Sequence, residues 1–149
     1  MNIGEFCPEF ELSDQHGKLF NSKDWIGKKK LVIFFYPKDE TPGCTKEACS
    51  FRDSHEEFLK YNCQVIGISS DSVESHRKFA ENHKFKFVLL ADTKKKVRKL
   101  FNVPGSLFGL IPGRVTYIID LDGKIRGIHN SQLNPFSHIK EALEIIKQL

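Results

Sequence analysis

Four uninterrupted apolar runs, alternating with stretches of helical spacing, constrain the fold of this chain more than any other feature. The runs are Leu31–Tyr36, Val65–Ser69, Phe87–Ala91 and Val115–Ile119. Each has the length of a strand and none has a polar face, as in strands that are buried on both faces of a sheet. The alternation therefore predicts an α/β fold in which helices flank a central mixed β-sheet.

Apolar residues that recur every three or four positions predict the covering helices. These helices fall within 48–59, 73–80 and 97–101, and a fourth follows Pro135. Two turn-rich segments predict antiparallel hairpins. Ser13–Gly17 separates two short apolar segments near the N-terminus, and Asp120–Gly123 carries the Asp-Gly signal of a tight turn into Lys124–His129. We therefore expect an N-terminal β-hairpin and an antiparallel partner for the last apolar run.

The size and composition of the chain favour a single domain. Its 149 residues are 40% hydrophobic, which is sufficient for one core, and no repeat or linker divides residues 1–149. No apolar run approaches the roughly 20 residues of a membrane-spanning helix. The first residues lack the pattern of a secretory signal. We therefore expect no membrane partner and a cytoplasmic location.

The charge pattern gives little support for a nucleic-acid partner. The formal net charge is only +4, and acidic residues occur throughout the chain. The two basic clusters, Lys28–Lys30 and Lys94–Lys99, are more typical of solvated faces than of a nucleic-acid groove. A basic binding module built on Lys94–Lys99 stays open as an alternative at this point. The glycine motifs of nucleotide-binding sites are absent from the sequence.

Four cysteines are too few for a disulfide scaffold in a chain that can fill its own core. They include no Cys-x-x-Cys pair, and the six histidines show no His-Glu-x-x-His pattern, so we expect neither a metal nor a cofactor. Cys7 and Cys63 are interpreted as small buried hydrophobic residues. A Cys44–His55 dyad is excluded, because eleven helical residues separate the two by roughly 16 Å.

Cys44 stands in a different setting, at the predicted start of the first long helix. Thr41 is a suitable N-cap residue, and Pro42 fits the first helical position, where its missing N–H costs nothing. Cys44 then falls in the first turn, where free backbone N–H groups and the helix dipole favour a thiolate. It shares a helix face with Ala48 and Phe51, which predicts a sulfur in a pocket rather than on the open surface.

Cys49 lies five residues beyond Cys44, on a different face of the same predicted helix. In a regular helix the two Cα atoms are about 8.6 Å apart, beyond the roughly 7 Å at which a disulfide can close. If the two cysteines pair, the first turns of the helix must unwind. The spacing thus permits a folded reduced state and a locally unfolded oxidised state. The alternative is that Cys49 only packs near the sheet edge.

The segment YPKDETPGCTKEACSFRD, Tyr36–Asp53, closely resembles the active-site segment of the peroxiredoxins, in particular the bacterioferritin-comigratory-protein or PrxQ subfamily. The resemblance extends to Gly4–Leu12, Gly67–His83 and Pro112–Ile125, and so covers essentially the whole chain. It implies a thioredoxin-like fold and the thiol-dependent reduction of hydrogen peroxide and organic hydroperoxides. A thioredoxin-like dithiol exchanger without peroxidase activity is the other enzymatic alternative, although the chain lacks Cys-x-x-Cys.

The resemblance also implies a role for each matched residue. Cys44 corresponds to the peroxidatic cysteine that becomes a sulfenic acid, and Cys49 to the resolving cysteine that forms a disulfide with it. Thr41 corresponds to the hydroxyl that helps to bind peroxide and thiolate, and Pro37 to the ring that shields the site. Arg114 corresponds to the guanidinium of the pocket, and Glu47 to the acidic residue that orients that arginine. The implied partners are a hydroperoxide and a thioredoxin or glutaredoxin reductant, and the implied form is a monomer.

The segment Asn102–Gly113 is apolar and rich in Gly and Pro, and it precedes Arg114. We interpret it as part of the active-site rim or as a partner-docking surface, with burial against the sheet as the alternative. The end of this segment and Asn134-Pro135 look closest to plant-plastid and cyanobacterial PrxQ proteins, so a plastid location is the alternative to the cytoplasm. Cys7 replaces the Ala that the family commonly has there, and it would be an additional reactive thiol if it were exposed.

Overall fold

The computed structural model describes residues 1–105 and 113–149. Within these residues seven strands form one mixed sheet in the order β2-β1-β5-β4-β3-β6-β7. The strands are β1 Glu11–Asp14, β2 Leu19–Asn21, β3 Lys30–Phe35, β4 Cys63–Ser69, β5 Val88–Ala91, β6 Val115–Ile119 and β7 Ile125–Asn130. β3, β4 and β5 are parallel to one another, whereas β1, β2, β6 and β7 pair in antiparallel fashion. The predicted mixed sheet and its N-terminal hairpin are confirmed.

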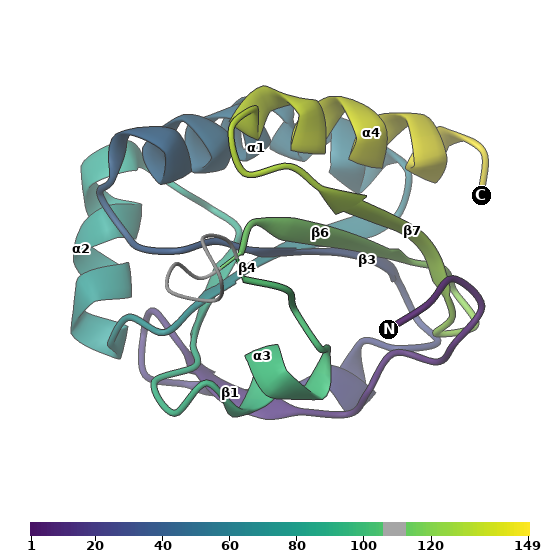
Figure 1. The fold of residues 1–149 in the computed structure, drawn as a ribbon, viewed down its shortest axis with the longest axis horizontal. Helices are drawn as coiled ribbons and strands as arrows, with labels where there is room; N and C mark the ends of the chain where they lie inside the picture. The colour runs from purple at the N-terminus through teal and green to yellow at the C-terminus, as the bar shows by residue number, and fades with distance from the viewer. Residues whose placement is uncertain (106–112) are drawn as a thin grey trace.

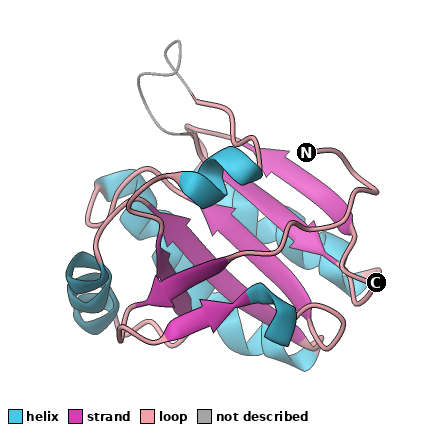
Figure 2. Cartoon of the chain, turned by 90° about the horizontal axis from the view of Figure 1, so that it is seen from below, coloured by secondary structure: helices cyan, strands magenta, loops and turns pink. Residues whose placement is uncertain are grey.

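Helices cover both faces of this sheet, as its apolar strands require. The helices of the described residues are α1 Pro42–Lys60, α2 Val73–His83, α3 Lys96–Leu100 and α4 Pro135–Lys147, with a short 3-10 helix at Ser22–Asp24. α1 and α4 lie side by side on one face (Figure 1). α3 lies over the opposite face, which is turned toward the viewer in Figure 2. The chain therefore has three layers, with the sheet between two sets of helices.

The side chains of β3 show why the apolar runs have no polar face. Phe34 points toward the core beneath α1, where its ring stacks on Phe51 with 4.4 Å between centroids. Phe35 points to the other side, where its ring lies 5.2 Å from that of Phe101, directly after α3. Both phenylalanines of β3 are fully buried. Aromatic packing on both faces thus fixes the end of β3, from which the chain enters α1.

Some boundaries differ from the sequence predictions. β3 begins at Lys30, whose side chain is buried and donates a hydrogen bond to the carbonyl of Tyr61 at 3.1 Å. The interpretation of Lys28–Lys30 as a solvated face is therefore wrong for Lys30. The ammonium group of Lys30 reaches the turn that follows α1, while the aliphatic part of the side chain stays in the sheet.

Residues 106–112 lie outside the described part of the chain, so the proposed rim or docking role of the segment Asn102–Gly113 stays a prediction.

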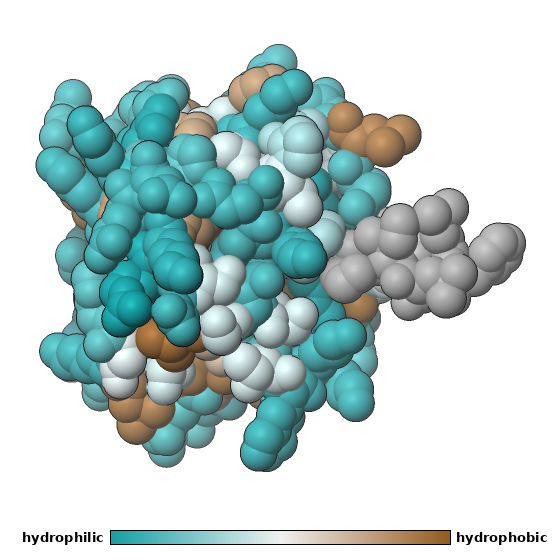
Figure 3. Space-filling view, turned by 90° about the vertical axis from the view of Figure 1, so that its left-hand side faces the viewer, coloured by the Kyte–Doolittle hydropathy of each residue, from teal (hydrophilic) through white to brown (hydrophobic). Residues whose placement is uncertain are grey.

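The side of the molecule that carries α2 presents mainly hydrophilic side chains, with smaller apolar areas between them (Figure 3). α1 begins on this same side (Figure 1). The Cys44 side chain near that end is only 1% exposed. The sulfur therefore lies beneath the hydrophilic surface and is not part of it.

Candidate active site

Cys44 lies in the first turn of α1, as its sequence predicts. The helix begins at Pro42, with Thr41 in the N-cap position. The Cys44 side chain packs with Ala48 and Phe51 in the core beneath the helix. Its sulfur thus occupies a pocket at the positive end of the helix dipole, where an anion is favoured.

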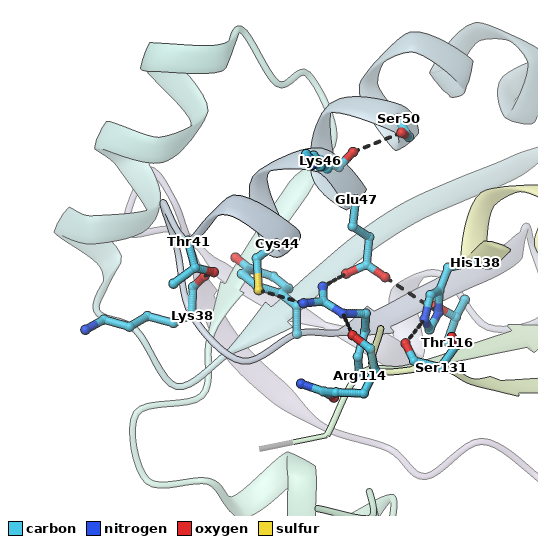
Figure 4. Close-up of polar contacts among 12 residues, drawn as sticks. Lys38, Thr41, Cys44, Lys46, Glu47, Ser50, Arg114, Thr116, Ser131 and His138 are labelled. Carbon is cyan, nitrogen blue, oxygen red and sulfur yellow. Dashed lines mark hydrogen bonds and ion pairs between the residues drawn. The ribbon is translucent and has the colours of Figure 1, made fainter. Parts of the chain in front are cut away.

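Arg114 reaches Cys44 from the position directly before β6. Its Nη2 donates a hydrogen bond to Cys44 Sγ at 3.3 Å, and its Nη1 donates to Oε1 of Glu47 at 2.7 Å (Figure 4). One planar fork therefore holds the sulfur and the carboxyl group at the same time. Burial lowers the pKa of Arg114, but Glu47 and Cys44 together raise it above its ordinary value. The guanidinium is therefore a permanent charge beside the sulfur.

Glu47 is fully buried one turn after Cys44. Burial raises the pKa of Glu47 to about 8, although Arg114 acts in the opposite direction. Its second oxygen, Oε2, faces Nδ1 of His138 in α4 at 3.5 Å. That ring nitrogen also lies 2.7 Å from the hydroxyl of Thr116 in β6. Three elements, α1, β6 and α4, thus meet at this carboxyl group.

Thr41 and Pro37 lie in the loop that leads into α1. Thr41 occupies the N-cap position, as predicted, but its side chain makes no capping hydrogen bond. Its hydroxyl instead donates to the carbonyl of Lys38 at 2.9 Å, which closes the turn before the helix. The hydroxyl oxygen keeps lone pairs that can accept a hydrogen bond. Pro37 is half-buried, two residues beyond the end of β3.

All four cysteines are free thiols. Cys44 and Cys49 lie on the same unbroken helix, so they cannot bond to each other without local unwinding. Cys49 is half-buried, and burial raises its pKa. Cys7 and Cys63 are buried, and burial raises the pKa of each thiol to about 12. Their interpretation as small buried residues is confirmed, and Cys7 is not an additional exposed thiol.

Known proteins are similar to this chain over nearly all of its length. The AhpC/TSA family profile matches residues 3–128. The chain belongs to the AhpC/TSA family of peroxiredoxins. It is 50% identical over 147 residues to chloroplastic peroxiredoxin Q of Arabidopsis thaliana, covering 99% of this chain and 68% of that protein.

Solved peroxiredoxin structures share the fold. The peroxidoxin BcpB of Mycobacterium tuberculosis superposes with a TM-score of 0.92 at 38% identity, covering 100% of this chain and 98% of that one. The bacterioferritin comigratory protein of Xanthomonas campestris superposes with a TM-score of 0.84 at 29% identity, covering 93% of this chain and 90% of that one. The predicted thioredoxin-like fold and the resemblance to the PrxQ subfamily are confirmed.

As a peroxiredoxin, the protein is a thiol-dependent peroxidase, with a hydroperoxide as substrate and a thiol as reductant. The dithiol-exchanger and nucleic-acid-binding alternatives are not favoured by these relatives. Among the described helices, none is long and apolar enough to cross a membrane. The plant relatives are named as chloroplastic proteins.

Arg98 contacts the backbone around the candidate site, a role that the sequence interpretation missed. Its guanidinium donates hydrogen bonds to the carbonyls of Tyr36 and Gly113, each at 3.2 Å. These two residues directly precede Pro37 and Arg114. Arg98 therefore braces both the segment that carries Pro37 and the segment that carries Arg114.

The prediction that Lys94–Lys99 forms a solvated face is wrong for Arg98, whereas the burial of Val97 agrees with the apolar spacing of the predicted helix. The lysines are exposed, but Val97 is buried and Arg98 is half-buried, with its guanidinium 5.6 Å from the centroid of the Phe35 ring. The apolar spacing that predicts this helix accounts for the buried Val97, but it contains no signal for Arg98.

A second buried network, also missed, holds the loop between β3 and α1. Oδ1 of Asp39 accepts a hydrogen bond from the Tyr36 hydroxyl at 2.6 Å, and Oδ2 lies 2.7 Å from Nδ1 of His76. The backbone N–H of Asp39 donates to Asp71 at 2.8 Å. Asp39, Asp71 and His76 are close enough together to hold a metal ion, but they already bond to one another and to their neighbours. We therefore assign them a structural role.

Gly43 permits the close approach of Arg114 to the site. A Cβ atom at residue 43 would lie 3.2 Å from Arg114 Nη2, nearer than an ordinary van der Waals contact. We expect Gly43→Ala to displace the guanidinium and to lower the rate constant with hydrogen peroxide about fivefold to tenfold. The melting temperature should rise slightly, because Ala favours a helical turn over Gly. Stopped-flow kinetics and thermal unfolding measure the two effects.

Lys46→Ala is the matched control for this substitution, because the Lys46 side chain is exposed on the same part of α1. It should leave the peroxide rate unchanged. A Gly43→Ala protein with a wild-type rate would show that Arg114 shifts without any cost to the reaction.

Proposed function

We propose that Cys44 is the peroxidatic cysteine of this peroxiredoxin and that Arg114 activates it. The observation that supports this most strongly is the 3.3 Å hydrogen bond from Arg114 Nη2 to the buried sulfur. The Cys44 thiolate attacks one oxygen of the hydroperoxide, so that an S–O bond forms while the O–O bond breaks. The leaving hydroxide or alkoxide takes up a proton and departs as water or alcohol. Cys44 is then a sulfenic acid.

The neighbouring side chains supply what this step needs. Negative charge develops on the leaving oxygen, so fixed donors must already point into the pocket. Arg114 provides these donors, and Glu47 orients them by holding Nη1. Thr41 offers a hydroxyl oxygen that can accept a hydrogen bond from the peroxide, and Pro37 shields the sulfur from bulk water.

Cys49 is the proposed resolving cysteine. Its thiol condenses with the Cys44 sulfenic acid to give a disulfide and water, which protects Cys44 from irreversible oxidation. The first turns of α1 unwind to let the two sulfurs meet. A dithiol reductant, thioredoxin or glutaredoxin, then restores both thiols by exchange. The likeness to the Xanthomonas protein, whose structures concern alkyl peroxide reduction, supports organic hydroperoxides as substrates beside hydrogen peroxide.

Mass spectrometry after one equivalent of hydrogen peroxide tests this scheme. The intact protein should lose two hydrogens, and digestion should give a peptide that links Cys44 to Cys49. Hydrogen exchange of the oxidised protein should show lost protection between Cys44 and Phe51. The Cys49→Ser variant should instead gain one oxygen at Cys44 and stop after one turnover with thioredoxin. A disulfide that involves any other cysteine, or sustained turnover by Cys49→Ser, would contradict the role of Cys49.

We further propose that residues 1–149 act as one domain and as a monomer. The continuous sheet from β2 to β7 supports the single domain. The position of both reactive cysteines on one helix supports the monomer, because resolution then needs no second subunit. The chloroplastic relatives favour the plastid alternative over the cytoplasmic expectation.

A further inference from the structure

One oxygen of the Glu47 carboxyl group is not used by the peroxidase scheme. Oε1 accepts a hydrogen bond from Arg114, but Oε2 is buried and has no hydrogen-bond partner in the described part of the chain. A buried ionised oxygen without a donor is unfavourable, because it has lost its water and gained nothing in return. The group that faces Oε2 is the imidazole of His138, with Nδ1 at 3.5 Å.

The hydrogen bonds of His138 determine what its Nδ1 can offer. Nε2 lies 2.8 Å from the carbonyl oxygen of Ser131, which can only accept, so Nε2 carries a proton. Burial lowers the pKa of His138 to about 4, so the ring is neutral near pH 7 and Nδ1 has a lone pair. The Thr116 hydroxyl, 2.7 Å away, donates to it. An ionised Glu47 would therefore face a lone pair instead of a proton.

The other charged groups around this pair do not supply the missing donor. Arg114 is committed through Nη1 to Oε1 of Glu47 and through Nη2 to Cys44. His129 of β7 packs edge-on against the ring of His138, with 4.7 Å between centroids, and its Nε2 contacts a serine of α4. Within the described residues no donor is bonded to Oε2, so a proton on Glu47 removes the cost of a buried anion at this position.

We propose that His138 is a positioning residue that keeps a proton on Glu47. With this proton, Oε2 is no longer an anion that faces Nδ1 of His138, while Oε1 continues to accept from Arg114. The charge of Arg114 is then not cancelled by a carboxylate, and more of it acts on Cys44 and on the leaving oxygen. The burial that raises the pKa of Glu47 to about 8 acts in the same direction. Only the effect on catalysis rests on the proposed role of Cys44.

Infrared difference spectroscopy of the reduced protein tests the proton directly, without reference to activity. Near neutral pH the wild type should show the C=O stretch of a protonated, buried carboxyl group, and this band should be absent from Glu47→Gln. The band should disappear as the pH rises through about 8. Its absence from the wild type at neutral pH would overturn the proposal, whatever the variants do.

Two variants should move the pH midpoint of the band in opposite directions. His138→Phe removes the ring nitrogen that faces the ionised carboxylate, so the midpoint should fall. Thr116→Val removes the competing donor to Nδ1, so the midpoint should rise. His138→Gln, whose amide oxygen can accept, should recover part of the loss, and His129→Phe is the matched control that should leave the midpoint in place. Equal midpoints in the His138→Phe and His129→Phe proteins would contradict a role for His138.

Peroxide kinetics test the link to catalysis separately. The wild-type rate constant should fall severalfold as the pH passes through about 8, because the Glu47 carboxylate then cancels part of the Arg114 charge. Glu47→Gln should lack this fall, since an amide cannot ionise. A wild-type rate that does not follow the infrared band would refute the link to Arg114. Failure of the Cys44 assignment would appear differently, as peroxide consumption by Cys44→Ser with the infrared band unchanged.

Discussion

Cys44→Ser should abolish hydrogen peroxide consumption by the reduced protein. Serine has nearly the same size, but its hydroxyl does not ionise near neutral pH, so the helix dipole and Arg114 have no anion to stabilise. The peroxide bond is then without its nucleophile, and we expect the rate constant to fall by more than about a thousandfold. Peroxide loss in the presence of a dithiol reductant measures this effect.

Cys7→Ala provides the matched control. Cys7 is also a buried thiol, but it packs on the opposite side of the sheet from Cys44. This variant should consume peroxide like the wild type. Circular dichroism and thermal unfolding establish that both variants are folded. Sustained consumption by Cys44→Ser would contradict the assignment and leave the other three thiols as candidates.

Arg114→Lys should lower the rate constant with hydrogen peroxide by about a hundredfold to a thousandfold. Lysine keeps a positive charge but replaces the planar fork with a single ammonium group. In the structure Nη2 binds the Cys44 sulfur while Nη1 binds Glu47, and one ammonium cannot reproduce both contacts in that geometry. Stopped-flow measurement of peroxide reduction gives the effect directly.

Arg126→Lys is the control for this substitution, because the exposed Arg126 side chain forms an ion pair with the buried Asp120 at 3.2 Å, away from the site. Its peroxide rate should equal that of the wild type. Alkylation of Cys44 by iodoacetamide at neutral pH should become slower only in Arg114→Lys. An Arg114→Lys protein with a wild-type rate would show that positive charge alone is sufficient and that the fork geometry is not required.

The sequence was sufficient to predict the sheet and the setting of Cys44, because both depend on local signals. Strands without a polar face and helices with one apolar face leave few ways to pack. Pro42 and the spacing of Ala48 and Phe51 fix where α1 begins and which side turns inward. Arg114 and Glu47 are different, since these contacting residues are 67 positions apart and only the family resemblance pointed to both.

The residues that sequence reasoning missed depend on tertiary contacts. His138 reaches the site only because α4 packs beside α1, and nothing near it in the chain indicates that a carboxyl group lies opposite. Arg98 stands in a basic cluster whose lysines are exposed, yet its own side chain turns toward the carbonyls of Tyr36 and Gly113. Thr41 occupies the N-cap position that the local rule predicts, but its hydroxyl donates to the carbonyl of Lys38 and its side chain makes no capping bond.

The buried network around Asp39 determines how far a change of shape at α1 can spread. Asp39 and Glu40 are bonded to side chains of α2, and Phe51 fixes the body of α1 in the core. A Cys44–Cys49 disulfide therefore disturbs a short stretch that is pinned at both ends. Once the disulfide is reduced, the helix should re-form within about a microsecond, because this step requires no new contact with a distant part of the chain. Reduction of the disulfide, and not refolding of the helix, should then limit the rate at which the reduced, active enzyme is regenerated.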